Sequence, residues 1–398
     1  MITNDEKKVD ELLTRGVSEV IVKSELRKKL LSGEQLRVKL GIDPTSPDLH
    51  IGRAVPLLKL RDFQKLGHHV ILIVGDFTAI IGDTSDKDAE RPMLERDIIE
   101  KNKESYFKQA GKIIDLDKVE LRYNSEWLEP LTYREIGEHA DQFSVADFIA
   151  RDVIKRRLDA GKRVSLREMI YPLMQGYDSV AVKADVELGG TDQKFNLLAG
   201  RTLQQKFGQR PQDILMSPLI DGLDGAKMSS SRGNYIALTA PSADMYGKIM
   251  SMSDNQVMTY FELCTRISME ELEDIKNALA SESLHPKDAK MRLAREIVTM
   301  YYDADAAQKA EDDWISTFSE GGVPENIQSA PPIKYGGSLI EAIGGLGISN
   351  SEMRRLLIAG AIREVEGEKE IFTDLKNPIN RDMVIRIGKH RFVRVRVS

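Results

Sequence analysis

The sequence predicts an α/β protein with a doubly wound parallel sheet, followed by a helical region and a small α+β region. Apolar runs at Val38–Ile42 and His69–Val74 flank a segment whose leucines and Phe63 recur at helical spacing. Strand, helix and strand in this order form a βαβ unit, which needs parallel strands. Residues 241–316 then show one helical pattern after another, with few strand signals.

The remaining elements of the sheet region follow in order along the chain. Residues 6–31 have an amphipathic helical pattern. The helix of the βαβ unit is expected from about Ile51 to Leu66, where Gly67 ends it. Two further strands and a charged helical stretch between them complete the region. They are predicted at Val119–Tyr123, Val180–Ala184 and about 125–165.

A segment rich in glycine and proline, residues 321–336, predicts a linker before the C-terminal region. After it, the pattern predicts a helix at Ser351–Ala359 and a last strand at Arg391–Val397, where basic and apolar residues alternate. We therefore divide the chain into residues 1–225, residues 226–320, the linker and residues 337–398.

The composition is typical of a globular protein, with 41% hydrophobic and 30% charged residues. Cys264 is the only cysteine, which excludes a disulfide framework and a cysteine-based zinc site, and the histidines form no H-E-x-x-H pair. We expect no bound metal. No apolar run approaches the ~20 residues of a membrane span. The N-terminus also lacks the apolar stretch of a secretory signal, so we expect a cytoplasmic protein.

The charge is unevenly distributed along the chain. The net charge of −6 argues against a wholly basic nucleic-acid binder. Residues 337–398, however, hold 11 lysines and arginines against 8 acidic residues. This asymmetry favours a small RNA-facing module on an acidic body, and the alternative is a solvated pair of basic strands.

The segment Pro44–Arg53 lies between a predicted strand and the start of a helix, where doubly wound sheets bind ligands. The N–H groups at a helix N-terminus favour phosphate. His50 can donate a hydrogen bond to a phosphate oxygen as charge develops there, and Gly52 lets a flat base approach the helix. The structural alternative is a capped helix with a surface histidine.

A second segment, Gly225–Gly233, holds Lys227 and three serines between glycines. Such a loop is mobile and suits phosphate. A serine-rich loop is usually only a loop, and this one gains significance from following the first segment in an α/β context.

The two segments resemble the HIGH and KMSKS signatures of class I aminoacyl-tRNA synthetases. Three further segments resemble those of bacterial tyrosyl-tRNA synthetases, namely Asn124–Trp127, Tyr171–Asp178 and Leu188–Gln193. The tail is similar to an S4 RNA-binding module, so the resemblance covers essentially the whole chain. It implies a Rossmann-like catalytic domain at 1–225, an α-helical anticodon-binding domain at 226–320 with the signature loop, and an S4-like domain at 337–398.

The resemblance implies a reaction in two steps. Tyrosine attacks the α-phosphate of ATP, which gives tyrosyl-adenylate and pyrophosphate, and the tyrosyl group then moves to the terminal ribose of tRNA(Tyr). Mg²⁺ is expected to arrive with ATP, bound mainly by the phosphates. The helical stretch at 125–165 resembles the dimer interface of the family, so a homodimer is expected.

The resemblance also implies roles for individual residues. Residues assigned to catalysis are Thr45, His50, Arg53, Lys87, Arg91, Lys227 and Ser230. Residues assigned to ATP are Gly41, Asp43, His50, Gly52, Gly190, Asp192, Lys227 and Met228. Residues assigned to tyrosine are Lys39, Thr78, Asp83, Tyr171, Gln175, Asp178 and Gln193. Residues assigned to RNA are Arg354, Arg355, Lys389, Arg391 and Arg394.

Asp178 is expected to accept the phenol hydroxyl of tyrosine. Phenylalanine would leave this carboxylate unpaired, which explains how the pocket would discriminate against it. The structural alternatives are a helix-start cap for Asp178 and a turn residue for Asp83.

The sequence departs from the family pattern at three positions. Arg53 replaces the last histidine of the first signature, and Ser230 replaces the second lysine of the second signature. Lys39 stands where some tyrosine enzymes have a second phenol-binding tyrosine, and it can instead pair with a carboxylate.

Three alternative functions remain at the level of sequence. A tryptophanyl-tRNA synthetase has the same chemistry, but Asp178 and the S4-like tail argue against it. A catalytically silent RNA-binding relative would fit the altered Arg53 and Ser230, although it leaves the intact pocket unexplained. A generic adenylyltransferase would explain only the first signature.

Overall fold

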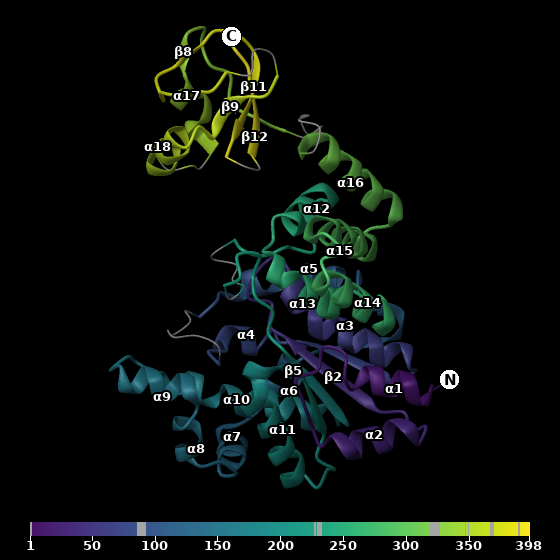
Figure 1. The fold of residues 1–398 in the computed structure, drawn as a ribbon. Coiled ribbons are helices and arrows are strands. Elements are labelled where there is room, and N and C mark those ends of the chain that lie inside the picture. Colours follow the sequence, from purple (N-terminus) through teal and green to yellow (C-terminus); the bar gives the residue numbers. More distant parts are fainter. Residues whose placement is uncertain are drawn as a thin grey trace. The chain divides into compact units, whose positions relative to one another are not determined.

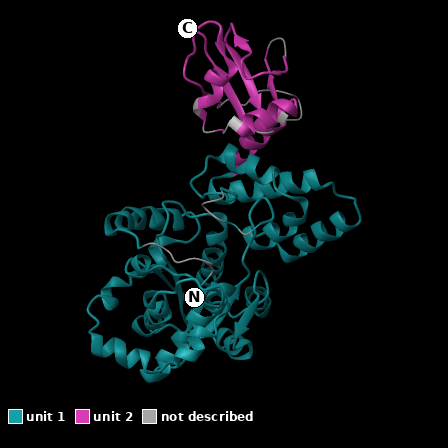
Figure 2. Cartoon of the chain, turned by 90° about the vertical axis from the view of Figure 1, so that its left-hand side faces the viewer, with its two compact units in different colours: residues 1–303 teal, residues 304–398 magenta. Residues whose placement is uncertain are grey.

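The computed structural model describes residues 2–85, 93–226, 228, 233–318, 327–346, 348, 350–366, 370–388 and 391–398. The chain forms two compact units, residues 1–303 and 304–398 (Figure 2). The functional boundaries predicted at residues 225, 320 and 336 stay a prediction.

Among the described residues, unit 1 is built on a six-stranded sheet with the order β1-β6-β5-β2-β3-β4. Helices surround this sheet, and its strands β2 and β5 are labelled in Figure 1. Five strands are parallel, and the short β1 pairs antiparallel with β6. The strands are β1 (Glu19–Ile21), β2 (Arg37–Ile42), β3 (His69–Val74), β4 (Val119–Tyr123), β5 (Val186–Gly190) and β6 (Asp213–Ser217). The chain adds β3 and β4 on one side of β2 and later β5 and β6 on the other. The strand order therefore reverses between β2 and β5, which is where such sheets bind ligands.

Helices connect the strands and pack on the sheet. The helix of the βαβ unit, α3 (Ile51–Lys65), contacts β2, β3 and β5, which confirms the prediction. A long helix, α10 (Leu166–Ala181), packs against α11 (Lys194–Lys206). The predicted helical stretch at 125–165 is present as four short helices. They are α6 (Ser125–Leu128), α7 (Tyr133–Ala140), α8 (Val145–Ile149) and α9 (Asp152–Asp159).

Two predicted elements of unit 1 are wrong. The helix predicted over residues 6–31 is interrupted, because α1 (Glu6–Leu12) and α2 (Lys23–Leu31) are separated by β1. Gly16 lies at a φ of +58° in the turn between them, a conformation that glycine adopts without strain. The strand predicted at Val180–Ala184 is instead the end of α10 and the turn after it.

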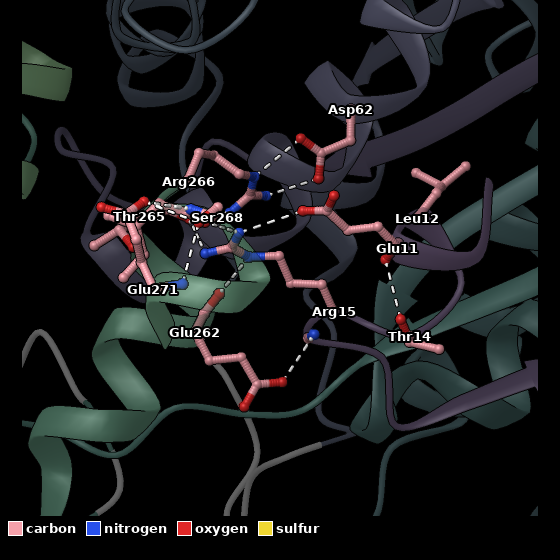
Figure 3. Close-up of polar contacts among 12 residues, drawn as sticks. Glu11, Leu12, Thr14, Arg15, Asp62, Glu262, Thr265, Arg266, Ser268 and Glu271 are labelled. Carbon is pink, nitrogen blue, oxygen red and sulfur yellow. Dashed lines mark hydrogen bonds and ion pairs between the residues drawn. The ribbon is translucent and has the colours of Figure 1, made fainter. Parts of the chain in front are cut away.

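The helical region of unit 1 contacts the N-terminal segment through a cluster of polar side chains (Figure 3). This helical region consists of α12 (Ser242–Met250), α13 (Val257–Cys264), α14 (Met269–Ala280) and α15 (Pro286–Tyr301). The buried Arg15 guanidinium donates to the carbonyl oxygens of Glu262 and Thr265, each at 3.1 Å, at the C-terminal end of α13. Arg266 also donates to both carboxylate oxygens of Asp62 on α3, at 2.9 Å each. The cluster therefore ties α3 and the N-terminal segment to the helices that follow the sheet.

Unit 2 begins with α16 (Ala304–Phe318), and its described part also contains a four-stranded sheet with the order β7-β12-β11-β9. The strands are β7 (Gln328–Ser329), β9 (Ile362–Glu364), β11 (Met383–Ile387) and β12 (Arg391–Val395). Two helices, α17 (Leu339–Ile343) and α18 (Asn350–Ile358), share one apolar core with one face of this sheet. The C-terminal helix and the last strand thus lie within two residues of their predicted bounds.

No helix within the described ranges is long and apolar enough to cross a membrane.

Candidate active site

A cavity of about 490 Å³ lies at the carboxyl ends of the parallel strands of unit 1. Each of these strands is followed by, or ends in, a residue that lines it: Asp43 for β2, Gly75 for β3, Asn124 for β4, Gly190 for β5 and Ser217 for β6. The cavity therefore occupies the position at which the reversal of strand order leaves room for a ligand.

Fifteen of the residues that the sequence assigns to the site line this one cavity. They are Gly41, Asp43, Thr45, His50, Gly52, Arg53, Thr78, Asp83, Tyr171, Gln175, Asp178, Gly190, Asp192, Gln193 and Met228. Lys39 is described but does not line it. Lys87, Arg91, Lys227 and Ser230 lie outside the residues that the structure describes.

His50 and Gly52 shape the start of α3. His50 is the N-cap, and its Nδ1 accepts the backbone N–H of Arg53 at 3.3 Å. The neutral imidazole therefore carries its proton on Nε2, which makes Nε2 the donor. At Gly52, a Cβ would lie only 2.9 Å from Met228 Sδ. The predicted cap and the predicted hydrogen-bond donor are thus compatible, because they use different nitrogens of His50.

Arg53 holds the loop of the first signature, residues 43–49, from within the cavity. Its guanidinium donates to the backbone oxygen of Asp43 at 3.2 Å and to Thr45 Oγ1 at 3.0 Å. It also donates to the hydroxyl of Tyr106 at 2.5 Å. The arginine that replaces the signature histidine therefore fixes the Thr45 hydroxyl in this structure.

Helix α5 (Arg96–Ala110) binds the same loop from its outer side. Asn102 Nδ2 donates to the Pro44 oxygen and Gln109 Nε2 to the Pro47 oxygen, each at 3.0 Å. The backbone N–H of Leu49 donates to Gln109 Oε1 at 2.8 Å. Sequence reasoning missed this helix, although its polar residues recur at the i, i+3, i+4 and i+7 spacing of one helix face.

One end of the cavity is acidic. Asp43 accepts hydrogen bonds from Thr78 Oγ1 at 2.7 Å and from the Tyr171 hydroxyl at 2.8 Å. Burial raises the pKa of Asp43 to about 6, although these two donors oppose the rise. Asp83 contributes a second carboxylate, which accepts from Gln193 Nε2 at 2.8 Å. An ammonium group would compensate for the burial of these two carboxylates.

Asp83 also has the turn role that is its structural alternative. Its Oδ1 accepts the backbone N–H of Ser85 at 2.9 Å, two residues further on. Its Oδ2 accepts from the Ser85 hydroxyl at 2.6 Å as well as from Gln193. The turn orients a carboxylate that lines the cavity, so the two roles are not exclusive.

Asp178 also lines the cavity and is 4% exposed. Its carboxylate accepts from Trp127 Nε1 at 2.8 Å and from Asn124 Nδ2 at 3.4 Å. Burial raises the pKa of Asp178 to about 7, against the lowering effect of Lys39 and of the two donors. Asp178 lies within α10, so the alternative of a helix-start cap is wrong.

Asn124 and Trp127 belong to a segment that carries the family resemblance, but the sequence does not assign them to the site. Asn124 lines the cavity and donates to Thr78 Oγ1 at 2.9 Å as well as to Asp178. Its position directly after β4 was the available signal, since ligands bind beyond the carboxyl ends of such strands.

Lys39 pairs with a carboxylate beneath the cavity. Its Nζ lies 3.0 Å from Glu187 Oε1, and the two side chains are 0% and 1% exposed. The residue that departs from the family pattern therefore acts from behind the cavity wall in this structure.

In unit 2, Arg354 and Arg355 are exposed on α18, and Arg391 and Arg394 are exposed on β12. Val393 and Val395 face the core that α18 completes, so Arg394 lies on the opposite face of the sheet. The predicted RNA-binding residues are thus not all on one face. Lys389 lies outside the described residues.

Comparisons with known proteins agree with this geometry. A family model described as tRNA synthetases class I (W and Y) matches residues 31–319. A tyrosine–tRNA ligase of Moorella thermoacetica is 46% identical over 392 residues, covering 96% of this chain and 94% of that protein. The chain belongs to the tyrosyl-tRNA synthetase family. A tyrosine–tRNA ligase of Shewanella oneidensis is 43% identical, covering 96% of this chain and 97% of that protein.

Solved tyrosyl-tRNA synthetases share the fold. A structure from Archaeoglobus fulgidus, described as complexed with L-tyrosine, has a TM-score of 0.63 and 24% identity, covering 77% of this chain and 100% of that chain. A C-terminally truncated mitochondrial enzyme from Aspergillus nidulans has a TM-score of 0.65 and 21% identity, covering 78% of this chain and 94% of that chain. These likenesses confirm the predicted α/β architecture.

Proposed function

We propose that the chain activates L-tyrosine with ATP to form tyrosyl-adenylate and pyrophosphate, and then transfers tyrosine to tRNA(Tyr). The observation that carries the proposal is the composition of one cavity. It combines the N-terminus of a helix capped by His50 with a buried carboxylate, Asp178, that two side chains orient. The first suits a phosphate group and the second suits a phenol hydroxyl.

In the first step, a carboxylate oxygen of tyrosine forms a bond to the α-phosphorus of ATP, and the bond to the β-phosphate oxygen breaks. No enzyme nucleophile takes part, so catalysis depends on positioning and on stabilising the developing charge. The Nε2–H of His50 and the hydroxyl of Thr45 are the proposed donors to the phosphates. Gly41, Asp43, Gly52, Gly190, Asp192 and Met228 are proposed to hold the nucleotide.

Lys87, Arg91, Lys227 and Ser230 are proposed to contact the departing pyrophosphate. Mg²⁺ would arrive with ATP as part of the substrate. Among the described residues, no group of three or more acidic, histidine or cysteine side chains is placed to hold a metal ion.

Asp83, Tyr171 and Gln175 are proposed to hold the α-amino group of tyrosine, with Thr78 and Gln193 beside them. The phenol hydroxyl would donate to Asp178. In the second step, a ribose hydroxyl of the tRNA attacks the acyl carbon, the bond from that carbon to the adenylate oxygen breaks, and AMP leaves.

We propose that the arginines of unit 2 bind the tRNA backbone, and that the protein is a cytoplasmic homodimer. Support for the dimer comes from exposed apolar side chains around the predicted interface, with Tyr133 97%, Val145 70% and Leu166 84% exposed. The oligomeric state follows from light scattering of the wild type and of Leu166→Asp. A monomeric wild type would refute the dimer.

The deciding experiment is ATP–pyrophosphate exchange with each of the twenty amino acids in turn. Exchange with tyrosine alone is the expected result. Exchange with tryptophan would favour a tryptophanyl-tRNA synthetase. No exchange from folded protein would favour an RNA-binding relative without catalysis.

A further inference from the structure

A fully buried ion pair lies behind the wall of the cavity. Lys39 on β2 and Glu187 on β5 are direct partners in the register of the two parallel strands. Their charged atoms are 3.0 Å apart, and neither residue lines the cavity.

The ion pair contacts the turn of α10 that faces the proposed tyrosine site. Lys39 Nζ donates to the backbone oxygen of Gln175 at 3.1 Å and to Ser179 Oγ at 2.6 Å. Glu187 accepts from Gln175 Nε2 at 3.2 Å and from Ser179 Oγ at 3.0 Å. It also accepts from Gln212 Nε2. The pair therefore holds Gln175 and Ser179, and Asp178 lies between these two residues in the sequence.

Stability alone is a poor reason for this arrangement. Removing two charges from water costs several kcal/mol per ion, and apolar residues in place of a buried ion pair are often as stable or more stable. An ammonium beneath a buried carboxylate has a second effect, because it favours the ionised form of that carboxylate.

Lys39, Glu187 and Tyr171 are described titratable groups that act on Asp178 electrostatically. Lys39 lowers its pKa, whereas Glu187 raises it less strongly. Tyr171 is the third group, and burial raises its own pKa well above the ordinary value, so it stays neutral. The ion pair as a whole therefore favours the ionised form of Asp178.

We propose that Lys39 is a positioning residue for amino-acid specificity: its ammonium, fixed by Glu187 beneath the turn of α10 that carries Asp178, makes Asp178 select a phenol. This inference rests on the proposed function. An ionised Asp178 facing phenylalanine would be buried without the phenol donor, which costs binding energy. A protonated Asp178 is neutral and would lose less, so the discrimination would weaken.

The test removes both charges of the pair in Lys39→Met/Glu187→Gln, which leaves no unpaired buried ion. The readout is the ratio of kcat/KM for tyrosine to that for phenylalanine, measured from pH 6 to 8.5. We expect this ratio to fall about fivefold near pH 7, since a one-unit rise in a pKa of about 7 lowers the ionised fraction at pH 7 about fivefold. It recovers as the pH rises and Asp178 ionises again. The KM for ATP stays unchanged.

The single variant Glu187→Gln has the opposite sign. It keeps the ammonium and removes the opposing charge, so the pKa of Asp178 falls and the pH profile of the ratio moves to lower pH. If the ion pair had only a structural role, both variants would change the tyrosine-to-phenylalanine ratio in the same direction.

A matched control is available between α2 and β6. Lys29 and Asp213 form another buried ion pair, at 2.6 Å and 7% and 4% exposed, and neither residue lines the cavity. Lys29→Met/Asp213→Asn removes the same two charges and leaves the tyrosine-to-phenylalanine ratio unchanged at every pH.

The pKa of Asp178 can also be measured without any activity, by NMR titration of ¹³C-labelled aspartate with Asp178→Asn for assignment. Upward movement in the double variant and downward movement in Glu187→Gln support the inference. A pKa that moves in neither variant overturns it, as does a ratio that falls equally at all pH values. Failure of the proposed function would show itself separately, as a wild type without tyrosine-dependent exchange.

Discussion

Single residues in this cavity are held at a cost to folding. Asp178 is fully enclosed, and its pKa is raised by burial from 3.8 to about 7. A carboxyl group whose pKa is higher in the folded state binds protons more tightly there. Its contribution to stability is therefore present below pH 3.8 and is lost as the pH rises through about 7.

The variant Asp178→Asn tests this cost. At pH 8 we expect it to have a larger free energy of unfolding than the wild type, by at most about 4 kcal/mol, with the difference shrinking towards pH 4. Tyrosine-dependent exchange should be lost, because the amide carries no charge to attract the phenol. Urea denaturation at pH 8 and pH 4 measures the first effect. A variant no more stable than the wild type at pH 8 would contradict it.

The proposed role of His50 as a hydrogen-bond donor leads to a prediction about the rate of tyrosine activation. His50→Ala should lower kcat for tyrosine activation by about 10²–10³-fold, the usual effect of removing one donor to a developing negative charge. The Kd of tyrosine should not change. The variant His285→Ala is the control for the loss of an N-cap, since His285 caps α15 by accepting the Lys287 N–H at 3.1 Å. Equal losses of activity in both variants would mean that His50 acts only as a cap.

At the scale of elements, the site is a loop held between two helices. Helix α3 supplies its own N-terminus to the site. Helix α5 binds the backbone of the first-signature loop, residues 43–49, through Asn102 and Gln109. Tyr106 on α5 joins the two, because its hydroxyl contacts both Arg53 and Ser46. A loop with these partners is fixed before ATP arrives, which lowers the cost of binding.

Tyr106→Phe should therefore raise the KM for ATP several-fold while the KM for tyrosine stays the same. Among the described residues, the hydroxyl hydrogen-bonds Ser46 of the loop and Arg53, so its loss loosens the phosphate side of the cavity. Steady-state exchange kinetics with each substrate varied in turn measure the split. Tyr335→Phe, at a 74% exposed position, serves as the control. A parallel rise in both KM values would count against a local role.

Most elements could be predicted from periodicity, and the exceptions have physical causes. Residues 180–184 and 186–190 both combine apolar residues with single charged ones, so the pattern alone cannot tell a helix end from the strand beside it. Strand β6 was missed, since its first residue is the charged Asp213, whose burial depends on Lys29 from far along the chain.

The site was predictable to a similar extent. Motif residues that follow strands converge on the cavity because the topology brings the strand ends together. Contacts that depend on strand register, such as Lys39 with Glu187, cannot be read from one sequence. The same holds for Trp127 with Asp178, which depends on how α10 packs.

At the scale of the whole molecule, the residues proposed for tyrosine activation and those proposed for tRNA binding lie in different units. The described residues that line the cavity all belong to unit 1, and the exposed arginines at positions 354, 355, 391 and 394 belong to unit 2. Activation of tyrosine and transfer to tRNA should then be separable.

A chain of residues 1–320 should keep tyrosine-dependent ATP–pyrophosphate exchange and lose most charging of tRNA(Tyr). The full-length variant Arg354→Ala/Arg355→Ala should raise the KM for tRNA and leave the exchange unchanged, because it removes only phosphate contacts. Filter-binding assays of charged tRNA, run beside exchange assays, measure both. Loss of exchange in the shortened chain would mean that residues 321–398 are needed for the first step.

The Arg15 side chain also has a consequence for the order in which the protein is made. It hydrogen-bonds carbonyl oxygens at the end of α13, and Thr265 follows it by 250 residues. Buried carbonyl groups need such partners, so the end of α13 is complete only when the N-terminal segment is in place. Arg15 leaves the ribosome 250 residues before Thr265 and must wait for it, so a nascent chain cannot complete the end of α13 from later residues alone.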